Sequence, residues 1–248
     1  PEIKEKMATL FEHNQVIDFT RDEANFYYSL RGDIRREWLA QKNLRLPGWI
    51  LARNYLLLHS ILQLATLHPG LVFEKFGQRI RNGEYRDEWE GEDISLHLQQ
   101  RWLHDDSSKL NALNNILRWK KDGVGRHERR SLIFLPYKLH LDYLQQWLKK
   151  RGYTVALLDG RLNARQKQNL LDRIHVTPYY MESLLHKATT LPYLAPELWR
   201  MIGQWADLPQ VLLVQNKVGS VGLNLQCFTQ VCYPIPMSST TLESQSIA

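Results

Sequence analysis

The chain has 248 residues, of which 44% are hydrophobic and 23% charged, and this balance is typical of a globular protein and excludes a disordered one. The length is enough for one large domain or two smaller ones with a buried core. Lysine and arginine total 32 against 26 acidic residues, a net charge of +6 that suits an anionic partner and equally an ordinary solvated surface.

Two features bear on the compartment. The cysteines, Cys227 and Cys232, form no Cys-x-x-Cys motif, which favours a reducing, intracellular setting. The chain begins Pro-Glu-Ile-Lys-Glu-Lys without a signal peptide, as an excised fragment would. The longest apolar run, Tyr55–Leu67, is interrupted by polar residues and is too short to span a bilayer, so no membrane partner is expected.

The first hundred residues predict a mostly helical segment. Gln15–Thr20 has the composition of a short strand, and Thr20-Arg21-Asp22-Glu23 is a capping box that starts a helix. Trp49–Leu67 predicts an apolar helix that ends at the following His-Pro pair. His68 of that pair has the chemistry of a ligand, but a packing or capping role is favoured.

The best boundary between domains lies between Glu74 and Asp93. This stretch is rich in charge and glycine, which predicts a loop or a weak helix. Its charges are of mixed sign, which is typical of a solvated surface. Residues Ile94–Leu103 predict a helix that links the two parts of the chain.

From Ser107 onward, strands and helices alternate. Helices of this length between strands require crossover connections and therefore predict a parallel sheet flanked by helices. The predicted order is helix Ser108–Trp119, strand Ser131–Leu135, helix Lys138–Arg151, strand Tyr153–Leu158, helix Asn163–Ile174 and strand Gln210–Val214.

A long connection interrupts this alternation at residues 175–208. It contains two apolar stretches, Tyr179–Lys187 and Pro196–Trp205, which predict helices separated by Thr189–Pro192. Long connections with their own structure tend to bind partners or substrates. A packing insertion without activity explains the pattern equally well.

A glycine-containing loop follows the last of these apolar strands. Gly219 and Gly222 allow the backbone to approach a ligand closely. Backbone amides there, with the side chains of Asn216, Lys217, Ser220 and Asn224, have the donors that hold a phosphate. A tight strand-to-helix turn would produce the same two glycines, so this spacing alone leaves both interpretations open.

The residues around these glycines resemble motif V of the Swi/Snf-type chromatin-remodelling ATPases, a branch of the superfamily-2 helicases. The family form is Leu-Leu-Ser-Thr-Lys-Ala-Gly-Gly-Val-Gly-Leu-Asn-Leu. The matching residues are Lys217, Gly219, Val221, Gly222, Leu223, Asn224 and Leu225, whereas Gln215, Asn216, Val218 and Ser220 depart. Val231 matches the next strand. Gln245–Ala248 resembles the start of motif VI, one residue short of its first arginine.

The resemblance extends to other stretches. Ser108-Lys109-Leu110 and Leu132-Ile133-Phe134 are similar to the entry to motif IV, and Leu158-Asp159-Gly160 to the loop that follows. The implied fold is α/β, a second RecA-like helicase lobe at residues 107–248 with a helical insertion at about 175–208. Residues 1–106 would be a mostly helical segment that links this lobe to a first lobe missing from the chain.

The implied chemistry is ATP hydrolysis with Mg²⁺ between two lobes. The chain contains neither a Walker A loop nor an Asp-Glu-x-His box, and its motif VI stops before the arginines. The resemblance therefore implies a DNA-dependent ATPase in a longer parent protein. It implies that this chain alone is inactive and binds neither ATP nor Mg²⁺ tightly.

The family's functional residues carry over to two sets of positions. In this chain no catalytic set is complete and no metal ligands are predicted. The nucleotide-cleft set is Gly219, Gly222, Asn224 and Gln245. The DNA-binding set is Lys109, Leu135, Pro136, Lys167, Asn216, Lys217 and Ser220.

Several of these positions depart from the family. Lys167 stands where the family has arginine, which keeps the charge and loses the bidentate fork. Leu135-Pro136 replaces Ser-Gln, so hydroxyl donation is lost there. Ile235–Thr240 replaces Asp-Pro-x-Trp-Asn-Pro, which indicates either a divergent subfamily or a decayed ATPase.

Three hypotheses for function follow. The favoured one is the C-terminal lobe of an ATP-dependent double-stranded-DNA translocase of the chromatin-remodelling or DNA-repair type, located in the nucleus. Its partners would be the duplex backbone, the missing lobe and chromatin or repair proteins. The alternative is a non-hydrolysing DNA- or protein-binding module derived from such a lobe. An unrelated enzyme that binds a dinucleotide through Gly219 and Gly222 is the third, disfavoured because no βαβ unit follows them.

Overall fold

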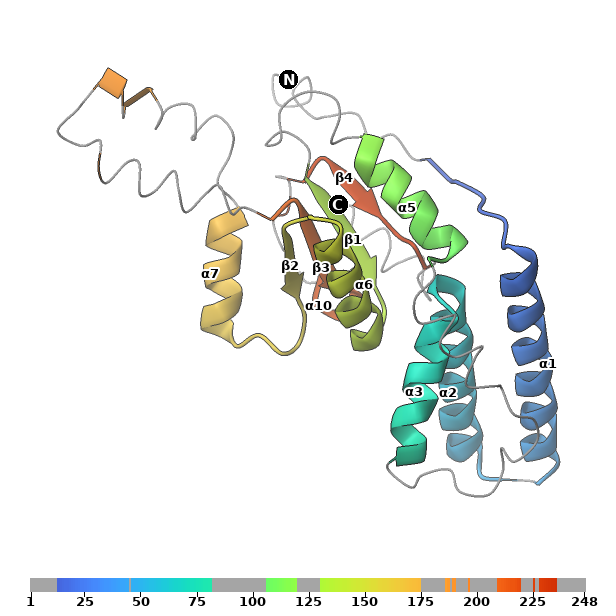
Figure 1. Ribbon diagram of the computed structural model, residues 1–248. Helices are drawn as coiled ribbons and strands as arrows, with labels where there is room; N and C mark the ends of the chain where they lie inside the picture. Colours follow the sequence, from blue (N-terminus) through green and yellow to red (C-terminus); the bar gives the residue numbers. More distant parts are fainter. Residues whose placement is uncertain are drawn as a thin grey trace, which may run out of the picture.

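The computed structural model describes residues 13–44, 46–81, 106–119, 130–174 and 209–219, with 186–187, 189–190, 196, 225 and 228–235. Its centre is a four-stranded sheet in the order β2-β3-β1-β4 (Figure 1). The strands are β1 (Ser131–Leu135), β2 (Val155–Leu158), β3 (Val211–Gln215) and β4 (Gln230–Cys232). Every strand pair is parallel, which confirms the predicted sheet.

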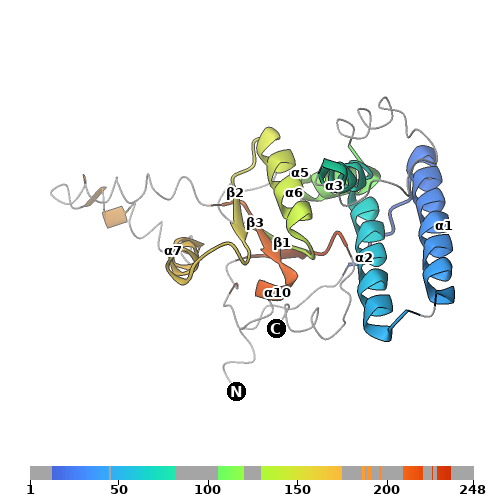
Figure 2. The same ribbon diagram turned by 90° about the horizontal axis from the view of Figure 1, so that it is seen from below.

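Helices cover both faces of this sheet. α6 (Lys138–Lys150) connects β1 to β2, and α7 (Ala164–Ile174) follows β2. α10 (Asn216–Gly219) follows β3 directly. Seen from below, α6 lies on one side of the sheet, and α7 and α10 lie on the other (Figure 2). The architecture is therefore the predicted α/β arrangement of a parallel sheet between helices.

Alternation along the strands creates two separate cores. On β1, all five residues are buried. Ile133 and Leu135 pack in the cluster that contains Leu141 and Leu144 of α6. Phe134 packs in the other cluster, with Ile174 at the end of α7. A strand buried on both faces explains the continuous apolar run in the sequence.

The end of α6 shows why the chain turns where it does. Gly152 adopts a φ of +80°, which favours glycine because a side chain at this angle is strained. The amides of Gly152 and Tyr153 donate to the carbonyls of Lys149 and Leu148, at 3.0 and 3.2 Å. This Schellman-type closure satisfies the last carbonyls of the helix and directs the chain into β2.

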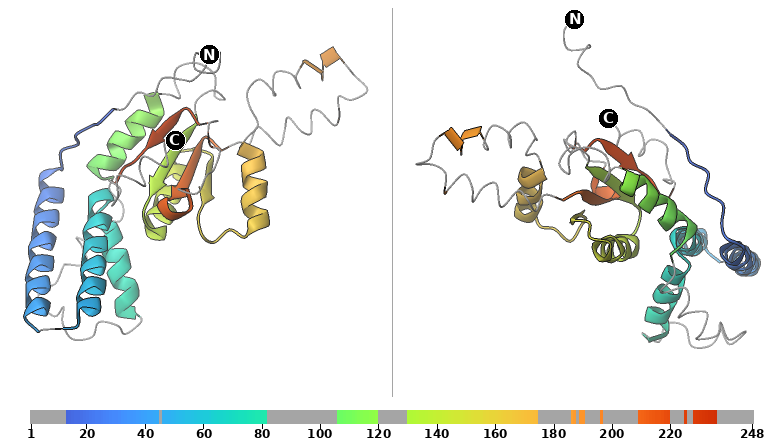
Figure 3. Two further views of the ribbon diagram at one scale, coloured as in Figure 1. Left: turned by 180° about the vertical axis from the view of Figure 1, so that it is seen from behind. Right: turned by 45° about the horizontal axis from the view of Figure 1, so that its top comes forward.

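The N-terminal segment is helical, as predicted. Its described part contains α1 (Arg21–Asn43), α2 (Gly48–Leu67) and α3 (Gly70–Arg81), and α5 (Ser108–Trp119) comes later in the chain. α1 and α2 pack side by side and extend away from the sheet (Figures 1 and 3). The predicted capping box forms: the Thr20 amide donates to Glu23, and the Glu23 amide donates to the Thr20 hydroxyl.

α2 is the most apolar of the long described helices, and its burial differs along its length. Trp49 and Leu56 in its first half are 69% and 65% exposed, whereas Leu64 and Leu67 in its second half are buried. Among the described residues it is the one helix that is both long and apolar enough to cross a bilayer, because it begins at Gly48, before the apolar run Tyr55–Leu67. A core helix of a globular protein passes the same test.

Other local predictions have mixed outcomes. The strand predicted at Gln15–Thr20 is wrong, because these residues belong to no sheet and lead directly into α1. In the stretch from Glu74, α3 continues to Arg81, and the rest, with Ile94–Leu103, lies outside the described residues. Thr189 and Thr190, predicted to separate two helices, are helical, and their hydroxyls donate to the carbonyl of His186.

Candidate functional site

The carboxyl ends of the four strands lie at one edge of the sheet, because all strands run in the same direction. Each end is followed by polar or turn residues. Across the sheet these are Asp159 after β2, Asn216 after β3, Pro136 after β1 and Tyr233 after β4. We call this set of four strand ends the carboxyl edge. In open parallel sheets ligands bind outside this edge.

Within the carboxyl edge, β1 and β3 form a topological switch point. The two strands are neighbours, and the helices that follow them leave toward opposite faces of the sheet. α6 packs on the face of Ile133, while Val218 of α10 packs on the face of Leu212. The two helices diverge from neighbouring strand ends, and such a point is where open α/β sheets place ligands.

Asn216 is the polar residue at this switch point. It begins α10, and its side-chain Oδ1 is buried without a hydrogen-bond donor in the described part of the chain. A buried carbonyl oxygen without a donor is unfavourable by about 1–3 kcal/mol. A donor from a ligand or from the segment that follows α10 would remove this penalty.

The loop after β2 is held by a compact ion network. The amide and Nε of Arg161 donate to the two carboxylate oxygens of Asp159, at 3.0 and 2.6 Å. The guanidinium also contacts Asp142 of α6 at 2.7 Å. Burial alone would raise the pKa of Asp159, but the hydrogen bonds from Arg161 outweigh it and lower the pKa. The same bonds to Asp159 and Asp142 raise the pKa of Arg161.

The stretch Leu158-Asp159-Gly160, which resembles a family loop, includes Asp159. Arg161 lies just outside it and was not predicted to have a role. Arg161 fixes the loop to α6, so Gly160 lies between two anchored residues. A methyl group at Gly160 would lie 3.9 Å from Oε1 of Gln215, an ordinary contact. The loop after β2 and the end of β3 are therefore neighbours at the carboxyl edge. In the sequence, the signal for this pair is an aspartate directly after an apolar strand, followed two residues later by an arginine.

Beneath the end of β1 lies a second polar group, formed by α2, α3 and α6. The hydroxyl of Tyr137 donates to Gln63 at 2.6 Å, and Lys75 donates to Ser60 at 2.8 Å. His140 is fully buried, and its ring lies 5.5 Å from that of Tyr137. Burial, with repulsion from two nearby lysines, lowers the pKa of His140 to about 3. This histidine is therefore neutral near pH 7.

The predicted DNA-binding residues lie in different parts of the structure. Asn216 and Pro136 lie at the carboxyl edge, and Lys167 lies half-buried on α7, the helix that follows the β2 loop. Leu135 is wrong as a side-chain contact, because it is fully buried in the core beneath α6. Pro136 has no amide hydrogen to donate to a phosphate, so it is at most a packing surface.

Lys109 has a partner within the protein. Its ammonium donates to the carbonyl of Pro234 at 2.9 Å, in the loop after β4. Burial lowers the pKa of Lys109. Its predicted role as a phosphate contact is therefore replaced below by a different proposal.

The rest of the predicted site is described only in part. Lys217 and Gly219 lie in α10, which shows that the chain turns into a helix straight after β3. Ser220, Gly222, Asn224 and Gln245 lie outside the described residues, as do most of the two helices predicted at residues 175–208. In the described part of the chain, no group of three or more His, Cys, Asp or Glu side chains has the arrangement of a metal site.

His68, considered as a possible ligand, has a structural role. It is fully buried, and its Nδ1 accepts a hydrogen bond from the amide of Gly70 at 3.0 Å. Its ring lies 5.0 Å from that of Tyr143 on α6. The histidine caps the turn between α2 and α3, which agrees with the favoured interpretation of the sequence.

Comparison with known proteins gives similarity in sequence and in fold. No family model matches the chain. It is 37% identical to helicase swr-1 of Neurospora crassa and 36% identical to helicase SWR1 of Gibberella zeae, each over 95 residues. In both cases the matched region is 37% of this chain and 5% of the relative, so the chain spans a small part of these helicases.

A solved structure extends the similarity to the fold. The crystal structure of the C-terminal part of the Fun30 ATPase domain superposes with a TM-score of 0.53 at 19% identity. The superposition covers 94% of this chain and 78% of the other. Together these findings confirm the predicted resemblance and the predicted RecA-like fold.

Proposed function

We propose that this chain, a C-terminal lobe of the Swi/Snf type, is one half of an ATP-dependent double-stranded-DNA translocase of the chromatin-remodelling or DNA-repair kind. The other half would be a first ATPase lobe elsewhere in a longer nuclear protein. Helicases matched in sequence are far longer than this chain, which supports such a parent. Further partners would be chromatin or repair proteins.

The observation that carries this proposal is the switch point between β1 and β3. The segment that resembles motif V begins there, with Asn216 at the strand end and α10 directly behind it. A ligand at a switch point meets backbone and side-chain donors from two strand ends at once. The orphan oxygen of Asn216 supports a contact at this position.

The DNA side of the site would lie along α10 and α7. Lys217 belongs to α10, and Arg165 and Lys167 belong to the first turns of α7. Lysine and arginine at one edge of a sheet attract phosphates without reading base sequence. We expect binding to a duplex backbone that weakens steeply with salt.

ATP and Mg²⁺ would belong to the complete, two-lobed protein. The carboxyl edge fits a nucleotide only in part. Asn216 at the switch point has a side-chain oxygen available to a ligand, whereas the carboxylate of Asp159, which could bind a metal, is bound by Arg161. The metal would therefore be held by the other lobe, where the family has its Walker A loop. With neither that loop nor the motif VI arginines in its sequence, the chain alone would not turn over ATP.

A specific observation favours a second candidate, a non-hydrolysing binding module. The family has an acidic residue where this chain has Ile235. Ile235 is 1% exposed and belongs to the core beneath α6. An ionised carboxylate would be unfavourable in that environment, so the substitution has turned a polar position into part of the core.

Two measurements on the full-length protein that contains this chain separate the candidates. The translocase is expected to hydrolyse ATP faster when duplex DNA is added. The binding module is expected to bind duplex DNA without such stimulation. Absence of both stimulation and binding would contradict both proposals.

A variant tests the site itself. Lys217→Ala should weaken binding equally to duplexes of different sequence and lower the slope of log affinity against log salt by about one. Lys149→Ala is the matched control, since Lys149 is an exposed lysine at the far end of α6. An unchanged slope for Lys217→Ala would remove this residue from the phosphate contacts.

A further inference from the structure

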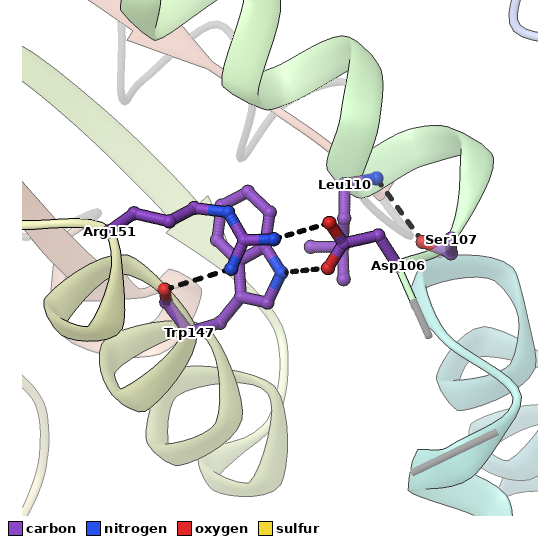
Figure 4. Close-up of polar contacts among 5 residues, drawn as sticks. All are labelled: Asp106, Ser107, Leu110, Trp147 and Arg151. Carbon is purple, nitrogen blue, oxygen red and sulfur yellow. Dashed lines mark hydrogen bonds and ion pairs between the residues drawn. The ribbon is translucent and has the colours of Figure 1, made fainter. Parts of the chain in front are cut away.

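Four consecutive residues at the start of α5 each bind a different element of the fold. The first is Asp106. One of its carboxylate oxygens accepts a hydrogen bond from Trp147 Nε1 at 2.7 Å, and the other forms an ion pair with Arg151 (Figure 4). The guanidinium of Arg151 lies 3.9 Å from the centroid of the Trp147 ring. This cluster attaches the start of α5 to the end of α6.

The next two residues bind the N-terminal helices. The hydroxyl of Ser107 donates to the carbonyl of Leu67, the last residue of α2, at 2.5 Å. Ser108 donates its amide to Glu23 at 2.8 Å and its hydroxyl to the same carboxylate. Glu23 also accepts the Thr20 amide, so one carboxylate, 4% exposed, caps both α1 and α5.

The fourth residue, Lys109, reaches the carboxyl edge. Its hydrogen bond to Pro234 links α5 to the loop that leaves β4. Ile235, next to Pro234, is anchored in the core. A carbonyl that accepts from a half-buried ammonium makes a charge-assisted bond, stronger than one between neutral groups.

We propose that Lys109 is a positioning residue, which fixes the loop after β4 relative to the N-terminal helices through the junction Asp106–Lys109. The inference rests on the proposed function in one respect: the loop leads toward the segment that resembles motif VI. The junction makes the placement of that loop depend on the start of α1, through Glu23 and Ser108. Lys109 then acts through the loop and does not touch DNA.

Hydrogen exchange tests the positioning directly, without activity. In the full-length protein, Lys109→Met should raise amide exchange across residues 228–235 by about tenfold, the effect of losing one charge-assisted hydrogen bond. Glu23→Gln should raise it in the same segment through Ser108, by a smaller factor. Lys149→Met, the loss of an exposed lysine on α6, should leave it unchanged. Unchanged exchange at 228–235 in both test variants would overturn the proposal.

Activity and DNA binding distinguish positioning from contact. In Lys109→Met we expect a lower kcat for DNA-stimulated ATP hydrolysis, an unchanged KM for DNA and an unchanged salt slope of DNA binding. Lys109→Arg keeps a cationic donor and should restore part of kcat. A salt slope reduced by about one would instead make Lys109 a phosphate contact and overturn the proposal.

The two proposals fail in different ways. If the unmodified protein shows no ATPase stimulated by DNA, the proposed translocase is wrong, and exchange at 228–235 still decides the role of Lys109. If Lys109→Met does not fold, Glu23→Gln and Lys109→Arg decide it by the same exchange measurement. Accelerated exchange in Glu23→Gln supports the junction, and unchanged exchange there overturns it.

Discussion

The two faces of the sheet are built differently. The face beneath α6 is covered by a continuous core that includes residues of α1, α2, α3 and α5. Among the described residues, the opposite face is covered by a smaller cluster, with α7 and α10 as its helices. In the part of the chain that the structure describes, one face therefore has several layers of helices over it, and the other has a single layer.

Buried polar contacts occur on both faces: on the α7 face, Arg130 donates to the carbonyl of Ile174 at 2.6 Å. The α6 face contains buried or bridging polar residues from distant parts of the chain, such as Glu23, His140 and Asp106. α7 is instead a polar helix with one fully buried residue, Ile174. The α6 face therefore acts as the scaffold, whereas α7 and α10 carry charged residues at the carboxyl edge. Three predictions test this division.

Truncating either of two adjacent leucines on β3 should cause the greatest loss of stability. Leu212 and Leu213 are both fully buried and point to opposite faces of the sheet. Replacement by alanine should lower the free energy of unfolding by about 2–5 kcal/mol in each case. Leu213→Ala should lie at the upper end, because its cavity is enclosed by several helices that cannot collapse together. Urea unfolding of the two variants measures the difference, and a larger loss for Leu212→Ala would break the division.

A smaller effect concerns the dependence of stability on pH. The pKa of His140 is about 3 in the folded protein, below its ordinary value of 6.5. Between these values the unfolded chain binds a proton that the folded chain does not, so stability falls as pH decreases. From pH 7 to pH 5 this amounts to about 2 kcal/mol for one group.

The variant His140→Phe should remove this dependence. Its urea midpoint is expected to change less between pH 7 and pH 5 than that of the unmodified protein. His59→Phe, a half-buried histidine on α2, serves as the control and should retain the dependence. An equal pH dependence in His140→Phe and the unmodified protein would show that the α6 face is more hydrated than its burial indicates.

The amino-acid pattern predicted the sheet and its helices well, for a physical reason. Strands buried on both faces have continuous apolar runs, as in Leu132–Leu135, and the capping box at Thr20 is a local signal that the structure preserves. The strand predicted at Gln15–Thr20 failed because an extended conformation becomes a strand only when a neighbour pairs with it.

The site was predicted less well, because long-range contacts decide it. Nothing in the local sequence shows that Lys109 meets the carbonyl of Pro234, 125 residues further along the chain. Leu135 was named from its place in a motif, but its alternation along β1 points the side chain into the core. Arg161 was missed because its role depends on Asp142, which comes from another helix.

Replacing Lys167 should have little effect on stability and a clear effect on the binding of duplex DNA. Lys167 lies half-buried on α7, on the thinly covered face of the sheet. Lys167→Ala should change the free energy of unfolding by no more than about 0.5 kcal/mol, as is usual for substitutions outside the core. It should also lower the salt slope of duplex binding by about one, because one phosphate contact is lost. Lys150→Ala, an exposed lysine at the end of α6, should leave both quantities unchanged. If Lys150→Ala weakens binding as much as Lys167→Ala, the positive charge acts from both faces, and α7 has no special part in holding the duplex.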